Sequence, residues 1–429
     1  MHFAATMIGI LAISLLTRRR PVTQWKFALL AAGCIALALA TFLISDPPRY
    51  FEDFRIAYYP AGEAVFRDTH ALRELTGLGV SGFVNMPVVA YIFAPLALMP
   101  MSVAMAIFTL IGLIATILAW KLLADLAQLD LTERWLLALL FAANGPLQYS
   151  VKEGNTSHFI LLALVAGLAL LRAGRPGLAG MVLGAAAIIK PPLLLFGLFF
   201  ALRRDARGLA AFALVCMAAV AASVALFGWA DNLHWLDVCV LQFSHRWLAA
   251  FNVQSIPAFL FRFEADPTLL LDWNAYAPPA GLALPAQLLL ALLLIAAGVA
   301  LLKSAALTSQ YMVILCLAVL ASPLSWSHYY CWLLLPTAFF LRREDVQGGS
   351  FRVLGWLAIL LVTPLVRPLT FSQSWAVEAY KDTGVSYLLF GGLLWFGLLI
   401  WQMTRVARTT TSTIGASKSS AHSWVFRTR

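Results

Sequence analysis

Long apolar runs alternate with short polar segments along almost the whole chain. The runs that are long enough to cross a bilayer, which takes about 20 residues of helix, are residues 26–44, 102–123, 208–227, 284–302 and 385–404. Shorter runs cover residues 135–147, 159–171, 177–189, 193–202, 311–324, 329–341 and 353–366. With the N-terminal run 1–16, the pattern predicts an all-α, polytopic membrane protein with about 12–13 transmembrane helices. The shorter runs predict broken or tilted helices, which are tolerated beside a cavity or inside protein.

Composition agrees with this interpretation and excludes two other classes of protein. The chain is 62% hydrophobic and 12% charged, whereas a soluble domain is about 45–50% apolar and roughly 25% charged. A disordered chain would need low hydrophobicity and high charge. The net charge of +10 fits either a nucleic-acid surface or basic residues on the cytoplasmic side of a membrane.

The positions of the charges decide between these two explanations. When Arg18, Arg19 and Arg20 are assigned to the cytoplasm, most of the 30 Lys and Arg residues fall inside and most of the 20 acidic residues fall outside. This is the distribution that the positive-inside rule predicts, so we expect membrane lipid and no nucleic acid as a partner. Residues 1–404 then form one membrane-embedded domain with long outer loops at 45–85 and 228–283. Residues 405–429, rich in Ser and Thr, form a cytoplasmic tail without ordered structure.

Several kinds of chemistry have no signal in the sequence. The five cysteines form no CxxC pair, and no HExxH or paired-His spacing is present, so we expect no metal and no disulfide framework. The sequence also lacks the GxxxxGK[ST] phosphate loop, which argues against an ATP-driven pump. We expect no cofactor. The absence of a convincing internal repeat weakens the case for a secondary transporter.

The first outer loop carries the first candidate for chemistry. It reads SDPPRYFEDFRIAYY over residues 45–59. Its aromatic and charged residues fit an interfacial belt, but a carboxylate at this boundary could also act as a general base on a sugar hydroxyl. The residues alone do not choose among Asp46, Glu52 and Asp53.

Four further clusters lie at predicted outer ends of the apolar runs. Prolines break residues 85–100 into a predicted half-helix, and residues 148–158 read QYSVKEGNTSH, a polar turn in which we interpret Lys152 and Glu153 as connecting residues. Lys190 precedes Pro191-Pro192, where it either binds a phosphate or extends to the membrane surface. His328, in ASPLSWSHYYCW, is either a belt residue or a phosphate ligand.

These segments, in this order, resemble glycosyltransferase family 87, a membrane-embedded family of the GT-C class. The residues that carry the resemblance are Asp53 to Tyr59, Lys190 to Pro192 and Ser322 to Tyr329. This chain has Gly154-Asn155 where the family usually has Gly-Gln, and Asn85-Met86-Pro87 lacks the usual aromatic-Pro-Pro pattern. The resemblance implies a GT-C-type fold in a bacterial-type plasma membrane, with the active site on the extracytoplasmic face.

The resemblance also implies an activity and roles for individual residues. It implies an inverting hexosyltransferase that takes a sugar, typically mannose, from a polyprenyl-phosphate donor to a lipid or glycan acceptor. Asp53 corresponds to the catalytic base, and His328, Lys190 and Arg55 are expected at the donor phosphate. The substrate cavity is expected to include Tyr58, Tyr59, Asn155, Trp326 and Tyr329.

Two other functions remain open on the sequence alone. A flippase or transporter of lipid-linked sugars would use the same cavity and cations but would need no catalytic carboxylate. An assembly subunit of an envelope-polymer complex would need neither this cavity nor a catalytic carboxylate. The large outer loops favour the enzyme, because a flippase needs access to its cavity from both sides of the membrane.

Overall fold

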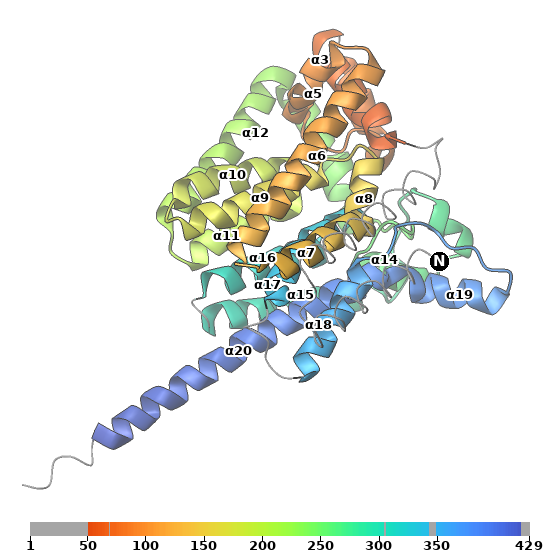
Figure 1. Ribbon diagram of the computed structural model, residues 1–429. Helices are drawn as coiled ribbons and strands as arrows, with labels where there is room; N and C mark the ends of the chain where they lie inside the picture. Colours follow the sequence, from red (N-terminus) through yellow and green to blue (C-terminus); the bar gives the residue numbers. More distant parts are fainter. Residues whose placement is uncertain (1–49, 68, 304–305, 343–348, 422–429) are drawn as a thin grey trace, which may run out of the picture.

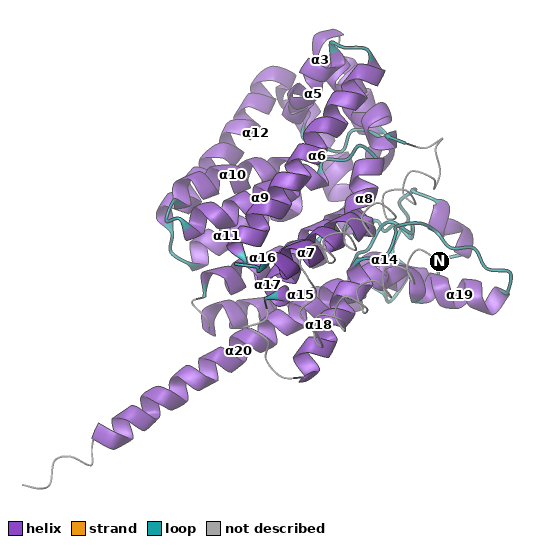
Figure 2. Cartoon of the chain, viewed as in Figure 1, coloured by secondary structure: helices purple, strands orange, loops and turns teal. Residues whose placement is uncertain are grey.

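The computed structural model describes residues 50–67, 69–303, 306–342 and 349–421, with the backbone alone from residue 405 onward. Within these residues the chain is built from helices and connecting segments, and it contains no β-strand (Figures 1 and 2). This confirms the predicted all-helical fold class. The predicted segments 1–16 and 26–44 lie outside the described residues.

The helices are joined by short connections. In chain order they are η2 (Phe54–Tyr58), α3 (Tyr59–Arg67), α4 (Thr69–Gly77), η3 (Gly79–Ser81), η4 (Pro87–Val89), α5 (Ala90–Ala97), α6 (Met101–Leu126), α7 (Leu131–Ala143), α8 (Gly145–Lys152), α9 (Ser157–Arg172), α10 (Pro176–Ile189), η5 (Pro191–Leu194), α11 (Leu195–Leu202), α12 (Ala206–Trp235), η6 (Leu236–Leu241), α13 (Gln242–His245), α14 (Ile256–Arg262), η7 (Pro267–Leu271), α15 (Ala283–Lys303), α16 (Leu307–Ala321), η8 (Ser327–Leu333), α17 (Leu334–Leu341), α18 (Gly349–Val362), α19 (Ser374–Asp382), η10 (Gly384–Ser386) and α20 (Tyr387–Ala421).

Four helical stretches of the described chain are long and apolar enough to cross a membrane. They are Met101–Leu126, Ala206–His245, Ala283–Lys303 and Ser374–Thr404. They confirm four of the long crossings that the sequence predicts. Large apolar side chains point outward along three of these helices, for example Leu110, Leu214 and Leu288. A soluble protein rarely exposes so much contiguous apolar surface, so lipid is the natural environment of these faces.

The helices form two groups. Figure 1 shows α9, α10, α11 and α12 together on one side of the molecule, with α15, α16, α18 and α20 on the other. One hydrophobic core joins the two groups, and α16 lies deep within it, with every residue from Gln310 to Leu320 buried. This central helix ends directly before the segment that carries His328.

The shorter apolar runs differ in detail from single straight crossings. The run 135–147 divides at Asn144, whose side chain accepts a hydrogen bond from the backbone N–H of Leu147 and so caps α8. The run 329–341 begins as the 3₁₀ turns of η8 before α17. Such breaks bring irregular backbone inside the helical bundle, where neighbouring protein satisfies its polar groups.

The second predicted outer loop begins as helix. At Gly228 the backbone kinks, with φ of 77°, and α12 continues to Trp235. The extended segment 246–255 that follows is held by the buried guanidinium of Arg262, which donates to the carbonyls of Ala249 (2.9 Å) and Ala250 (2.6 Å). The backbone N–H of Ser327 donates to the carbonyl of Asn252 at 2.8 Å. The segment 228–283, predicted as the second outer loop, is therefore tied to the His328 segment.

The last helix is longer than the crossing that the sequence predicts. α20 runs on past Thr404 to Ala421, into the segment that we expected to lack ordered structure. Backbone continuity with an apolar, well-packed helix favours adding further turns, because each added residue costs less than starting a new helix.

Helix α3 approaches α5 closely at Gly62. A substitution at this contact therefore tests the packing of the two helices next to the turn that carries Asp53. A Cβ at Gly62 would lie 2.8 Å from the backbone carbonyl carbon of Phe93. We predict that Gly62→Ala lowers stability by about 1–3 kcal/mol, the usual cost of overpacking. Thermal unfolding of the purified protein in detergent measures this change.

The matched control is Gly298→Ala in α15, where an added Cβ meets nothing within 4 Å. Because alanine favours helix over glycine, this variant should be as stable as the wild type or slightly more stable. Equal unfolding temperatures for Gly62→Ala and Gly298→Ala would contradict the described packing of α3 on α5.

Candidate active site

The turn that carries Asp53 is held against the turn between α8 and α9. The backbone N–H of Phe51 donates to the carbonyl of Lys152 at 2.7 Å, and that of Phe54 donates to the carbonyl of Glu153 at 3.3 Å. Phe51 adopts a positive φ of 63°, which is uncommon and unfavourable for a bulky residue. Gly154 is also at positive φ, and a Cβ there would lie 2.7 Å from Cβ of Phe54. Only glycine fits this close approach, which fixes where Asp53 points.

Asn155 connects the acidic and the basic side of the site. Its Nδ2 donates to Asp53 Oδ2 at 2.6 Å and to the hydroxyl of Tyr58 at 3.3 Å. Its Oδ1 accepts from Lys190 Nζ at 3.1 Å and from the backbone N–H of Ser157 at 3.1 Å. Asn155 is 3% exposed, so its amide orientation is fixed by these bonds on both sides. One side chain thereby holds a carboxylate and an ammonium group near each other.

Lys190 reaches this network from the break between α10 and η5. Pro191 and Pro192 start η5 and end the preceding helix, since proline lacks the amide donor. The ammonium group is buried and lies 5.1 Å from the centroid of the Tyr329 ring. A cation in this position is stabilised by the face of the aromatic ring as well as by Asn155.

His328 lies among aromatic rings without a polar partner. Its ring plane is nearly parallel to those of Tyr149 and Trp326, with centroid distances of 6.4 and 6.3 Å. The residue is 5% exposed, and neither ring nitrogen has a hydrogen-bond partner among the described residues. Buried polar groups are normally satisfied, so two unsatisfied nitrogens beside a pocket indicate that a ligand completes them.

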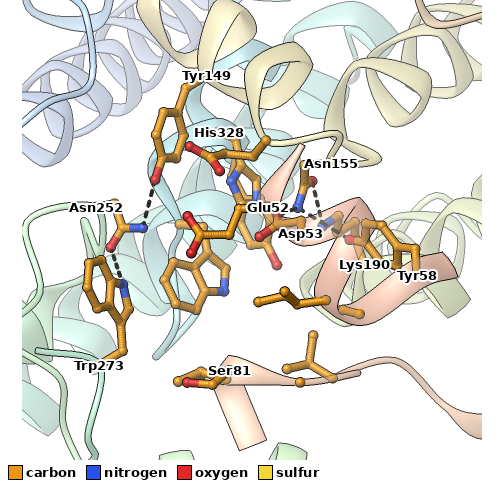
Figure 3. A pocket seen from close by; sticks show the side chains of 18 residues that line it. Glu52, Asp53, Tyr58, Ser81, Tyr149, Asn155, Lys190, Asn252, Trp273 and His328 are labelled. Atoms are coloured by element: carbon orange, nitrogen blue, oxygen red, sulfur yellow. Dashed lines mark hydrogen bonds between the residues drawn. The ribbon is translucent and has the colours of Figure 1, made fainter. Parts of the chain in front are cut away.

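These groups line one pocket of about 290 Å³. Figure 3 shows Asp53, Asn155, Lys190 and Tyr58 along one wall and Tyr149, Asn252 and Trp273 along the other, with Glu52 between them. The remaining lining residues are Ile56, Ala57, Val80, Ser81, Gly82, Val84, Glu153, Trp326, His328 and Tyr329. The pocket therefore brings together Asp53, His328, Lys190, Tyr58, Asn155, Trp326 and Tyr329, which the sequence analysis assigned to the site.

Two predicted site residues lie elsewhere. Arg55 is exposed and does not line the pocket, and Tyr59 is buried in the neighbouring core, where its hydroxyl donates to the carbonyl of Met99 at 2.8 Å. The cause is helical phase. Successive helical residues are rotated by about 100°, so Arg55 and Tyr59 point away from the wall on which Asp53 lies.

Other residues of the pocket were not recognised from the sequence. The sequence predicts that Glu153 belongs to a plain connecting turn, but the residue is 7% exposed and lines the pocket. The feature of the sequence that points to Glu153 as a pocket residue is its position directly before the Gly154-Asn155 turn. Asn252 and Trp273 come from the second outer loop, and Tyr149 from α8. Only the tertiary fold brings these three side chains to the pocket.

Two carboxyl groups of the pocket, those of Asp53 and Glu153, have raised pKa values. Burial raises the pKa of Asp53, while the hydrogen bond from Asn155 and the charge of Lys190 act in the opposite direction. Burial, with repulsion from Asp53, raises the pKa of Glu153 to about 7, and Lys152 partly offsets this shift. A carboxylate with a raised pKa is a stronger base near neutral pH.

An apolar groove of about 480 Å³ adjoins this polar pocket. The two share Val84, Trp326 and Tyr329 in their walls. The groove is otherwise lined mainly by apolar side chains, among them Pro191, Phe243 and Leu324. The site is thus amphipathic, with charged groups at one end and an apolar channel at the other.

Comparison with known proteins identifies the family. The sequence profile of glycosyltransferase family 87 matches residues 83–323, which is more than half of the chain. The chain belongs to glycosyltransferase family 87. No curated protein and no solved structure matches it.

This membership identifies the protein as a membrane glycosyltransferase, and its pocket as the candidate active site. The matched range of the family 87 profile includes Asn155 and Lys190, while Asp53 and His328 lie on either side of it. Among the residues that the structure describes, no group of three or more His, Cys, Asp or Glu side chains is arranged to hold a metal ion.

The buried Glu153 of this family 87 enzyme should make stability depend on pH. A carboxyl group whose pKa rises from 4.5 in the unfolded chain to about 7 in the fold destabilises the fold as pH increases through that window. We predict that Glu153→Gln is more stable than the wild type at pH 8, by at most about 3 kcal/mol. The difference should vanish near pH 4.5, and thermal unfolding at both pH values measures it.

Glu63→Gln serves as the control, because Glu63 forms a surface ion pair with Arg67 at 3.5 Å in α3. Exposed pairs of this kind contribute little, so this variant should unfold like the wild type at both pH values. If Glu153→Gln showed the same unfolding temperature as the wild type at pH 8, the carboxylate would not be buried as described.

Proposed function

We propose that this protein transfers a hexose, with mannose as the sugar expected from the family, from a polyprenyl-phosphate donor to a lipid or glycan acceptor. The observation that carries the proposal is the amphipathic site. A polar pocket with a carboxylate, an ammonium group and an unsatisfied histidine adjoins an apolar groove, with which it shares three lining residues. A donor with a charged head and a long apolar chain matches both parts.

The charges of the pocket favour a monophosphate donor. Among the described residues that line it, Lys190 is the one Lys or Arg, and three carboxyl groups lie nearby, on Glu52, Asp53 and Glu153. A sugar joined to a polyprenyl phosphate carries one negative charge, which Lys190 can neutralise. A nucleotide sugar or a diphosphate would bring more negative charge beside these carboxyl groups, and repulsion between like charges is costly where water is partly excluded.

The contacts of Asp53 support its role as the base. Asn155 fixes one carboxylate oxygen at 2.6 Å, which leaves the other to accept the proton of an acceptor hydroxyl. The acceptor oxygen then bonds to the anomeric carbon as the bond from that carbon to the phosphate oxygen breaks. The electron pair of the broken bond goes to the phosphate, where Lys190 and His328 stabilise the developing charge. Attack from the face opposite the phosphate inverts the anomeric configuration.

The distribution of charge supports action at the outer face of the plasma membrane. The site lies at the end of the molecule where α9 begins, beside Asn155, whereas Arg172 ends the same helix roughly 24 Å away. Arg203 and Lys303 mark the ends of α11 and α15. Basic residues at these ends fit a cytoplasmic location, which would place the pocket on the extracytoplasmic side.

The proposal is tested by removing the charge of Asp53. We predict that Asp53→Asn lowers sugar transfer by at least about 10²-fold, the scale of a lost general base, because the amide cannot accept the proton. Purified protein in lipid vesicles, supplied with radiolabelled polyprenyl-phosphate sugar and a lipid extract as acceptor, gives the rate.

Arg55→Gln is the matched control, since Arg55 lies two residues away but outside the pocket; it should transfer at a rate close to that of the wild type. Equal loss in the two variants would argue against the assigned base. Movement of the labelled donor across the vesicle membrane without any transfer product, in the wild type and in Asp53→Asn alike, would instead indicate a flippase.

A further inference from the structure

The pocket has two ends with opposite electrostatic character. Lys190 lies 5.1 Å from the ring of Tyr329, and Tyr329 also lines the apolar groove. Pro191, the next residue after Lys190, lines the groove too, so the cation lies beside the groove. Glu52 and Glu153 line the pocket but not the groove, as do Tyr149, Asn252 and Trp273. If the donor occupies the groove and the cationic end, the acidic end is left for the acceptor.

The groups at the acidic end are suited to hydroxyl donors. Asn252 donates through Nδ2 to the hydroxyl oxygen of Tyr149 at 3.2 Å and accepts through Oδ1 from Trp273 Nε1 at 3.0 Å. The amide is thus held in place by both neighbours, and the hydroxyl hydrogen of Tyr149 stays available to a ligand. Ionised carboxylates only accept hydrogen bonds. Glu52 and Glu153 therefore offer several acceptor positions beside one donor.

Burying the carboxyl group of Glu153 costs free energy that its few partners offset only in part, which indicates a role in binding. The side chain is 9% exposed, and its ion pair with Lys152 is long at 3.7 Å. Burial and the nearby charge of Asp53 disfavour its ionised form. A buried carboxyl group with so little compensation is typical of a functional site. The unsatisfied nitrogens of His328 in the same pocket independently indicate a ligand.

We propose that Glu52 and Glu153 determine acceptor specificity, by hydrogen bonding to the hydroxyl groups of an uncharged carbohydrate and repelling acceptors that carry an anion next to the reacting hydroxyl. This inference rests on the proposed function for its assignment of donor and acceptor ends. The two carboxylates select the acceptor in two ways. They accept hydrogen bonds from the hydroxyl groups of an uncharged sugar, and they repel an anionic one. Trp273 and Trp326 also line the pocket and offer aromatic surface to the C–H groups of a sugar ring.

The test compares two probes that differ in one group. Octyl β-D-glucopyranoside carries a CH₂OH group where octyl β-D-glucuronide carries a carboxylate. Their dissociation constants are measured at pH 8 for the full-length protein in nanodiscs of zwitterionic lipid. Farnesyl phosphate is added to occupy the site at Lys190, because a free ammonium group there would attract the glucuronide. We expect the wild type to bind the neutral glycoside at least tenfold more tightly than the glucuronide.

The double variant Glu52→Gln, Glu153→Gln should reduce this preference to about threefold or less, mainly because it binds the glucuronide more tightly. Glu63→Gln, on α3 and outside the pocket, should keep the wild-type preference. Equal affinities in the wild type, no binding of the neutral glycoside, or an unchanged preference in the double variant would overturn the inference.

The design separates this inference from the proposed function, because binding of the glycosides requires no sugar transfer. Transfer from the polyprenyl donor without charge selection would reject the specificity assignment alone. Charge selection that depends on Glu52 and Glu153, in a protein that transfers no sugar, would support the binding assignment and reject the transferase.

Discussion

The site depends on one buried arrangement, in which Asn155 holds the carboxylate of Asp53 and the ammonium group of Lys190 at 2.6 and 3.1 Å. Taking two opposite charges out of water is expensive, and their attraction repays the cost only when further hydrogen bonds satisfy them. The amide donates a hydrogen bond to the carboxylate of Asp53 and accepts one from the ammonium group of Lys190. Each charge is thus compensated, although the two charged groups are not bonded directly to each other. Asp53 therefore keeps an oxygen for a substrate proton, and Lys190 keeps N–H donors for a phosphate.

The surrounding backbone holds Asp53 and Lys190 in position relative to each other. Asp53 is placed by backbone hydrogen bonds to the turn at Lys152 and Glu153, and Lys190 by the helix break before Pro191. The same break forms a wall of the apolar groove. A lipid-linked substrate that enters the groove would thus meet the cation first and the carboxylate next. The acidic residues Glu52 and Glu153 line the polar pocket but not the groove, so the site combines apolar, cationic and anionic surfaces.

Much of the fold and part of the site follow from the sequence. The long apolar runs predict the crossings at α6, α12, α15 and α20, because hydrophobic length is a direct physical requirement of a bilayer. Lys190 and His328 are candidates because charged or titratable groups at the ends of apolar runs are costly and so tend to be functional. The choice of Asp53 over Asp46 and Glu52 rests on the resemblance to the family. What the sequence does not supply is helical phase and long-range contact. Arg55 and Tyr59 are close to Asp53 in sequence but point away from the pocket. Asn252 and Trp273 lie far from Asp53 in sequence but line the same cavity.

The most direct test of the account is a cryo-electron microscopy structure of the protein in lipid nanodiscs with a polyprenyl phosphate bound. The account predicts phosphate density within hydrogen-bond distance of Lys190 Nζ and of a His328 ring nitrogen, with the polyprenyl chain along Pro191, Phe243 and Leu324 in the apolar groove. Phosphate density at another place, or a chain that leaves this groove empty, would contradict the account of the site.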